Sequence, residues 1–411
     1  MKSFLFACLF FAAASARATD NWPQFRGPDG QGHADEAKLP LTWDPTNHIA
    51  WRTELPGTGW SSPVIWGDQI WMTTATDSNL SLRALCVEKS SGKLLHDVEI
   101  FRREKPMVIQ NKNSHASPTP VIEEGRVYVN FGTTGTACLD TGTGKILWRN
   151  TELQLDHMVG PGSSPAIYKN LLVIPCDGTN VQYVAALDKD TGKIAWKTPR
   201  SGDLNCAADT RKAFCVPLAV NVDGQDQLII PGAHWAYAYE PMTGKEIWKI
   251  RMPGFSNTPR PVAGHGLVYI DTGFMKPELW AVRLGGHGTL DASQVAWKCD
   301  KKMPLKPSPL LAGDELYVVS DNSSATCLDA KTGTVIWEQR FTGNFSASPI
   351  IASGRIYFCS EEGKTTVVKA GRTFEAAATN ELHERIMASP AVSRDALFIR
   401  TDKALYRIEE K

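Results

Sequence analysis

The stretch ALDKDTGKIAW, Ala186–Trp196, recurs along this chain of 411 residues with its internal spacing intact. Full copies are CLDTGTGKILW (Cys138–Trp148), AYEPMTGKEIW (Ala238–Trp248) and CLDAKTGTVIW (Cys327–Trp337), and a degenerate copy, CVEKSSGKLLH (Cys86–His96), ends in His. Self-similarity at a period of roughly 40–50 residues indicates a propeller, a solenoid or another array. The sequence predicts the fold more directly than the function, because repeats of this kind specify a scaffold and leave the site to loops.

A second landmark lies upstream of each repeat. It is a small residue with a proline, two apolar residues, a turn and an alternating strand, as in SPLLAGDELYVV, Ser308–Val319. Proline is tolerated at the start of a strand, and period-two alternation is typical of half-buried strands. Each interval has room for four short strands, so every proline predicts one propeller blade. The eight prolines are Pro63, Pro120, Pro165, Pro217, Pro261, Pro309, Pro349 and Pro390.

The two ends of the chain predict how the ring closes. HIAWRTEL, His48–Leu55, has the pattern of a unit's last strand but precedes the first proline, whereas the chain after Pro390 stops without such a strand. Pairing these ends removes two exposed sheet edges. We therefore predict an all-β fold, an eight-bladed β-propeller of four-stranded antiparallel blades, closed by an N-terminal strand that completes the last blade. Seven blades are the alternative if the degenerate unit Arg260–Asp300 is not a blade.

The tryptophans that close the repeats are predicted to be structural. A large indole at one equivalent position per unit can be buried between neighbouring sheets with its N–H free to find a partner. The Thr-Gly of the motif allows the positive φ that a tight hairpin needs. The predicted blade-docking residues are Trp51, Trp148, Trp196, Trp248, Trp297 and Trp337.

Composition and the N-terminal pattern predict an exported protein. Lys plus Arg equals Asp plus Glu at 44 each, so no single-sign field indicates a nucleic acid partner. A charged start, the apolar run Phe4–Ala14 and a small-residue site predict a signal peptide over residues 1–18. An extension over residues 19–46 and one propeller domain over 47–411 follow, and no later run is long and apolar enough for a transmembrane helix. We expect a periplasmic or extracellular monomer.

Export permits disulfides without requiring them. Cys206 and Cys215 lie in one loop, LNCAADTRKAFC, and could form a local bridge. Cys86, Cys138 and Cys327 share one repeat position, where other units carry Ala, so they are predicted to be small core residues. No CxxC pair and no His/Cys cluster has metal-ligand spacing, so no metal site is predicted.

Candidate binding residues lie in segments that lead into innermost strands or follow a strand on the same rim, because these segments converge at the mouth of the central channel. Several His and an Arg around one opening would bind an anion or a sugar, and loops on a rigid scaffold are where binding residues tend to sit. The alternative is that each is a solvated rim residue or satisfies backbone groups. The sequence shows no nucleophile–base pair, so no catalytic residue is predicted. The candidates are His115, His157, Asp177, His234, Arg260 and Lys306, with Asn257 close to Arg260 in sequence.

The AxDxxTGKxxW unit resembles the tryptophan-docking motif of pyrroloquinoline-quinone (PQQ) repeat propellers, from roughly Asn47 to the C-terminus. The opening WPQFRGPDGQG, Trp22–Gly32, is similar to the start of exported PQQ-like propeller proteins. One branch that the resemblance implies is the quinoprotein alcohol and glucose dehydrogenases, which hold PQQ with Ca²⁺, an Asp base, a stacking Trp and a disulfide between adjacent cysteines. The other is the assembly factor BamB, which binds a partner protein and has no cofactor.

The sequence favours the binding branch. It contains no Cys-Cys pair, and no position matches the calcium ligands of the dehydrogenases. We therefore expect an exported module without cofactor or catalytic activity that binds an envelope protein, a saccharide or a small anion. A PQQ- and calcium-dependent quinoprotein oxidoreductase and a carbohydrate-binding propeller are the alternatives.

Overall fold

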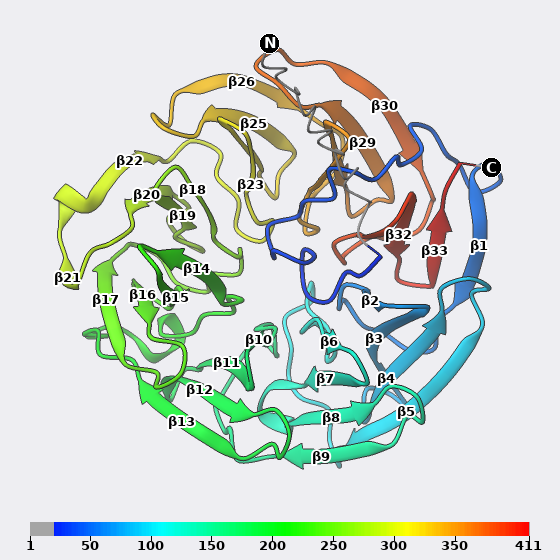
Figure 1. The fold of residues 1–411 in the computed structure, drawn as a ribbon, viewed down its shortest axis with the longest axis horizontal. Helices are drawn as coiled ribbons and strands as arrows, with labels where there is room; N and C mark the ends of the chain where they lie inside the picture. The colour runs from blue at the N-terminus through cyan, green and yellow to red at the C-terminus, as the bar shows by residue number, and fades with distance from the viewer. Residues whose placement is uncertain (1–19, 411) are drawn as a thin grey trace, which may run out of the picture.

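The computed structural model describes residues 20–410 and arranges them as eight β-sheets around a central axis, which Figure 1 shows end-on. The predicted signal peptide, residues 1–18, lies outside the described residues. Helical structure in the described part of the chain is limited to the short 3-10 turns η1 (Gly132–Thr134), η2 (Ala208–Thr210) and η3 (Ala292–Gln294). No helix among residues 20–410 is long and apolar enough to cross a membrane.

Seven blades follow one another along the chain, and the strands of each blade run from innermost to outermost in sequence order. Blade one contains β2 (Val64–Trp66), β3 (Gln69–Thr76), β4 (Ser81–Glu88) and β5 (Leu94–Arg102), and blade two contains β6 (Val121–Glu123), β7 (Arg126–Asn130), β8 (Thr136–Asp140) and β9 (Ile146–Asn150). Blade three contains β10 (Ala166–Tyr168), β11 (Leu171–Asp177), β12 (Gln182–Asp188) and β13 (Ile194–Pro199), and blade four contains β14 (Leu218–Val222), β15 (Gln225–Ile229), β16 (Trp235–Tyr239) and β17 (Glu246–Arg251). Blade five contains β18 (Val262–Gly264), β19 (Leu267–Asp271), β20 (Leu279–Arg283) and β22 (Val295–Cys299). Blade six contains β23 (Leu310–Ala312), β24 (Glu315–Val319), β25 (Ser324–Asp329) and β26 (Val335–Arg340), and blade seven contains β27 (Ile350–Ala352), β28 (Arg355–Cys359), β29 (Lys364–Lys369) and β30 (Ala376–Glu381).

The eighth blade joins the two ends of the chain. It contains β31 (Ala391–Ser393), β32 (Ala396–Arg400) and β33 (Ala404–Ile408), and its outermost strand is β1 (Ile49–Glu54). β1 pairs antiparallel with β33, with Arg52 opposite Tyr406. The predicted eight-bladed propeller and its closure by an N-terminal strand are therefore confirmed, and the degenerate unit Arg260–Asp300 forms blade five.

The docking tryptophans reach from one blade onto the next. The indole N–H of Trp148 donates to the Lys189 carbonyl at 2.9 Å, and its ring lies against Gly192 in the neighbouring blade's turn. Gly192 has φ +71°, and a Cβ there would lie 2.5 Å from the indole ring, so only glycine satisfies both the turn and the contact. The same donation joins Trp51 to Lys89, Trp196 to Pro241, Trp297 to Ala330 and Trp337 to Gly371.

Trp248 is the exception among the predicted docking residues. Blade five has no Thr-Gly-Lys turn for it to meet, and the chain between β20 and β22 instead forms β21 (Gly288–Leu290). β21 pairs parallel with β17, which gives blade four a fifth strand where four were predicted. Trp248 is therefore fully buried and donates to the Gln227 side chain of its own blade at 3.2 Å.

Two other blades fill the docking position differently. His96, which replaces Trp in the degenerate copy, stacks on Trp71 at 5.6 Å, and a Cβ at Gly144 of the next blade would lie 2.9 Å from its ring. The outermost strand of blade seven has no aromatic residue. Trp43, which comes from the segment before β1, stacks there on Tyr357 at 6.3 Å.

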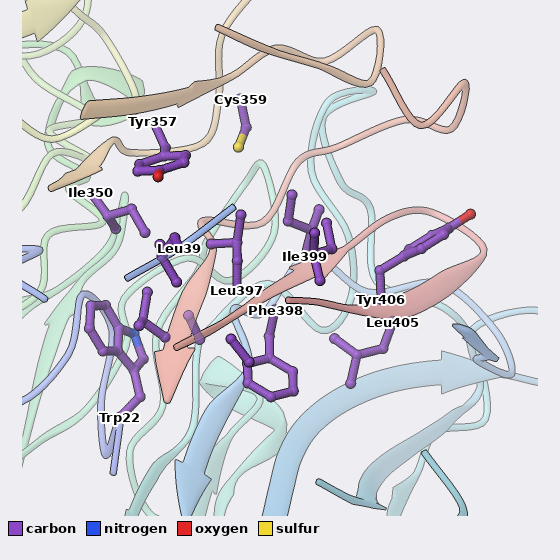
Figure 2. Close-up of a cluster of buried hydrophobic side chains, with 14 of the residues drawn as sticks. Trp22, Leu39, Ile350, Tyr357, Cys359, Leu397, Phe398, Ile399, Leu405 and Tyr406 are labelled. Atoms are coloured by element: carbon purple, nitrogen blue, oxygen red, sulfur yellow. The ribbon is translucent and has the colours of Figure 1, made fainter. Parts of the chain in front are cut away.

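The N-terminal extension, described from residue 20 to 46, lies across one end of the axis, where Figure 1 shows it as the dark blue trace near the centre. The backbone N–H of Trp22 donates to Ile65 of blade one, and that of Ala34 donates to Ile351 of blade seven, both at 2.8 Å. Trp22 is fully buried in a cluster that includes Leu39 and residues of blades seven and eight, as Figure 2 shows. The extension is therefore part of the propeller's core.

A histidine holds the extension in place through both of its ring nitrogens. His33 Nδ1 lies 2.6 Å from Asp29 Oδ2, and Nε2 lies 2.6 Å from the Leu311 carbonyl oxygen. Both partners accept hydrogen bonds, so both nitrogens carry protons and the imidazole is cationic. Burial alone would lower the pKa of His33, but the hydrogen bond and charge of Asp29 outweigh it and raise the pKa above its usual value.

We predict that Gly192→Ala destabilises the protein by about 3 kcal/mol, because the new methyl group must displace the Trp148 indole and the residue has a positive φ. Gly224→Ala is the matched control, since Gly224 also has a positive φ but nothing lies within 4 Å of its Cβ position. It is expected to cost only about 1 kcal/mol. Guanidinium unfolding of both variants measures the difference, and equal losses would contradict the docking account.

We also predict that His33 contributes stability that depends on pH. Its folded pKa is raised, so the contribution is fully present below the unfolded value near 6.5 and is lost as the pH rises through the folded pKa. The difference in unfolding free energy between the native protein and His33→Gln should therefore shrink from pH 5.5 to pH 9. His383→Gln, at an exposed site, serves as the control. A difference in unfolding free energy for His33→Gln that is the same at pH 5.5 and pH 9 would refute the cationic assignment.

Candidate functional site

A cavity of about 470 Å³ opens at one end of the propeller axis. Its walls come from the segments that lead into the innermost strands and from turns between second and third strands, such as those of Phe274 and Asp321. The extension instead contacts turns between first and second strands, such as those of Gly67 and Ser353, at the other end. Phe25 is the extension residue that lines the cavity, so the extension closes its inner end.

A ring of hydroxyl groups surrounds the axis, formed by the Ser or Thr that precedes six of the eight repeat prolines. In six blades the backbone N–H at this position donates to the hydroxyl of the corresponding residue in the next blade at 2.8–3.1 Å. The ring is interrupted where blades four and five carry Val216 and Arg260. The donors are Ser62, Thr119, Arg260, Ser308, Ser348 and Ser389, and the acceptors are Thr119, Ser164, Ser308, Ser348, Ser389 and Ser62.

An aromatic wall stands at the interruption of the hydroxyl ring. Phe214, Phe255 and Phe274 line the cavity there, and the last two rings meet edge-on at 5.6 Å. The segments of blades four and five are tied together, because Phe214 N–H donates to the Asn257 carbonyl at 2.8 Å. Lys212, on the same segment, also lines this part of the cavity.

A second part of the mouth, next to the aromatic wall in blade order, is ionic. Lys306 Nζ lies 2.7 Å from Asp321 and 3.7 Å from Glu361, and Lys112 Nζ lies 3.1 Å from Glu361. Burial pushes the pKa of Glu361 upward, but the Ser346 hydroxyl and the two lysines hold it below its usual value. These ion pairs leave polar, ionised groups at the mouth while satisfying their charges.

Of the six predicted site residues, only Lys306 lines the cavity. His157 does not line it and accepts the Thr133 N–H through Nε2 at 3.0 Å, and burial lowers its pKa to about 4. His115 is buried with Nε2 2.8 Å from the Met107 carbonyl. Both histidines therefore satisfy backbone groups, which was the alternative to a binding role.

The other three predicted residues have structural partners. Asp177 and Arg200 form a buried ion pair at 2.6 Å. Arg260 is buried and donates to carbonyl oxygens of Phe25 and Pro217 at 2.8 and 2.7 Å, so it ties the extension to blade four. His234, with a positive φ, packs on Phe255 at 6.1 Å, behind the aromatic wall. Nearby, the buried Asn257 side chain donates to the Asp271 carbonyl.

The local bridge that Cys206 and Cys215 could form is absent from the structure, where both cysteines are free. Cys215 is buried with its Sγ 3.2 Å from the Pro259 carbonyl oxygen, whereas Cys206 is only half-buried in the loop. Cys86, Cys138 and Cys327 are buried core residues, as predicted.

Sequence reasoning missed Trp60, Lys112 and Lys212 at the cavity. Their segments have no common motif, so spacing could not place these side chains. The hydroxyl ring had a usable signal, because a Ser or Thr precedes six of the eight repeat prolines.

The described residues offer no carboxylate-rich site of the kind that would hold the calcium ion of a quinoprotein dehydrogenase. No group of three or more His, Cys, Asp or Glu side chains within residues 20–410 is placed to hold a metal ion. Asp321, which lines the cavity, and Glu361 are each paired with a lysine. No chemical step through a quinone follows from this geometry.

Comparison with known proteins finds relatives that include both assembly factors and oxidoreductases. A family model described as outer membrane protein assembly factor BamB matches residues 180–289 and 278–401, together more than half of the chain. Outer membrane protein assembly factor BamB of Shewanella oneidensis is 21% identical over 306 residues, which cover 68% of this chain and 71% of that protein. Quinoprotein alcohol dehydrogenase PedH of Pseudomonas putida is 27% identical over 254 residues, 54% of this chain but only 38% of that enzyme.

Among solved structures, the quinohemoprotein alcohol dehydrogenase of Comamonas testosteroni superposes with a TM-score of 0.67. The match covers 98% of this chain and 82% of that one at 12% sequence identity. At this identity the likeness concerns the fold alone.

We predict that Ser348→Ala lowers the unfolding free energy by about 2 kcal/mol, because it leaves the buried Ser308 N–H without an acceptor. Ser90→Ala, at an exposed turn, should stay within about 0.5 kcal/mol of the native protein. Denaturant titration compares the two variants. An unchanged unfolding free energy for Ser348→Ala would show that the hydroxyl ring does not hold the cavity wall.

Proposed function

The chain belongs to the PQQ-repeat propeller family described as outer membrane protein assembly factor BamB, and on that premise we propose that it is a binding module of the cell envelope that holds a partner protein at its axial cavity. Export by a cleaved signal peptide, a periplasmic location and action without a cofactor are parts of the same proposal. The relatives named as outer membrane protein assembly factors support the envelope setting.

The observation that carries the proposal is an apolar rim around the cavity mouth. Val108, Met158, Phe274 and Met275 are 79%, 49%, 48% and 72% exposed, although they are large apolar side chains. Phe274 lines the cavity, and the others lie within two residues of lining residues. Exposed apolar side chains that gather at one place mark interaction sites on soluble proteins.

The scaffold suits a binding role at this rim. The rim loops lie on eight sheets joined by docked indoles and by the hydroxyl ring, so the binding surface is held rigid before a partner arrives. A rigid surface pays less conformational entropy on binding. The extension closes the other end of the cavity, which leaves the mouth as the accessible side.

Site-specific photo-crosslinking in cells tests the proposal. A photoreactive residue at Val108 or Met275 should crosslink the same envelope protein. The matched controls are Leu147 on β9 and Val335 on β26, which are 48% and 44% exposed but lie on outermost strands. Capture of that protein from the outer strands and not from the rim would overturn the proposed surface.

A second measurement separates the binding module from an oxidoreductase. PQQ and Ca²⁺ are added to the purified chain, and dye-linked oxidation of ethanol and glucose is followed. We expect no turnover above that of PQQ with Ca²⁺ alone, because within residues 20–410 no group of three or more His, Cys, Asp or Glu side chains is placed to hold a metal ion. Protein-dependent turnover would favour the quinoprotein alternative.

A further inference from the structure

Lys212 is a buried cation in the wall of the axial cavity. Its side chain lines the cavity, and the residue is only 6% exposed. Nζ donates to the Asp209 carbonyl oxygen and lies 5.1 Å from the centre of the Phe255 ring. A carbonyl dipole and an aromatic face stabilise an ammonium group, but neither neutralises its charge.

The other two cavity lysines are already neutralised. Lys112 and Lys306 lie within 3.1 and 2.7 Å of carboxylate oxygens. Within residues 20–410, by contrast, no carboxylate oxygen lies within 4.0 Å of Lys212 Nζ. Burial lowers the pKa of Lys212, and the more distant charge of Asp209 offsets only part of that effect. Burying an unpaired charge is costly, which makes this position one where an incoming anion would gain most.

The surroundings of Lys212 restrict what that anion is attached to. Phe214, Phe255 and Phe274 form the wall beside it, at the point where the hydroxyl ring is interrupted. An occupant that presents only polar groups would cover these rings without making favourable apolar contacts with them. Aromatic or large aliphatic side chains gain from such contacts, both by area and by edge-to-face geometry.

We propose that Lys212 is the anion-recognition residue of the cavity, and that the occupant is a segment of the partner protein in which an Asp or Glu stands next to an aromatic or large aliphatic residue. The carboxylate pairs with Lys212 Nζ, and the neighbouring side chain packs on the phenylalanine wall. This inference rests on the proposed function and names the chemistry of the partner. A polypeptide is favoured over a free carboxylate because the apolar rim continues the phenylalanine wall outward through the exposed Phe274 and Met275.

Selection from a random heptapeptide display library on the immobilised full-length chain tests the proposal. Peptides recovered on the native chain should be enriched in Asp or Glu adjacent to Phe, Tyr, Trp or Leu. Lys212→Met should abolish the acidic enrichment, because it keeps an apolar stem without the charge. Lys193→Met, an exposed lysine in a turn between the third and fourth strands, should leave the selection unchanged.

One selected peptide is then measured by calorimetry against its Asp→Asn or Glu→Gln counterpart. We expect the amide peptide to bind about tenfold more weakly to the native chain, as a charge-assisted hydrogen bond implies. The same change should make no difference to the Lys212→Met chain. Lys212→Arg, which restores a cation, should restore the preference for the acid and so excludes a merely misfolded loop.

Three outcomes would overturn the proposal: a selection without acidic enrichment, an acid preference that survives in Lys212→Met, or binding of 3-phenylpropanoate as tight as that of the peptide. The last result would identify a small carboxylate as the occupant. These outcomes are independent of the crosslinking test, since a partner captured from Val108 and Met275 without any acid preference would retain the docking surface and remove only the role of Lys212.

Discussion

The contact between an indole and a glycine of the next blade is the interaction on which this structure depends. Trp148 on Gly192 shows why: the indole N–H reaches a turn carbonyl, and the ring occupies the space that any side chain at the glycine would take. Each such contact sets the position of one blade against its neighbour. Repeated around the axis, these contacts bring the segments before the innermost strands together, and the cavity forms where they meet.

Periodic features could be predicted from the sequence, and single side chains in loops could not. Trp51 and the missing last strand predicted the closure because both follow from the repeat. His157 and Lys306 occupy comparable segments, yet His157 bonds to the backbone of blade two and Lys306 lines the cavity. That choice depends on where the neighbouring backbone places its donors. Lys212 lies in a loop without a counterpart in other units, so no spacing indicated it.

The departures from the repeat are compensated locally. Trp248 has no Thr-Gly-Lys turn to meet, and the parallel strand β21 covers it. Blade seven lacks a closing aromatic residue, and Trp43 from the extension stacks on Tyr357 instead. In one case another part of the chain covers the docking indole, and in the other case it supplies an indole where the blade has none. The extension is thus a structural part of the propeller. It covers one end of the axis, whereas the cavity opens at the other.

The proposed function requires that the extension seals one end of the propeller, so that a partner binds at the other. Native-state hydrogen exchange of the extension amides tests this most directly, because Trp22 and Ala34 donate to blades one and seven. We predict that these amides exchange as slowly as the strands they bond, since they open only when those blades open. Exchange at the rate of an unstructured peptide, with the blade strands still protected, would contradict the account.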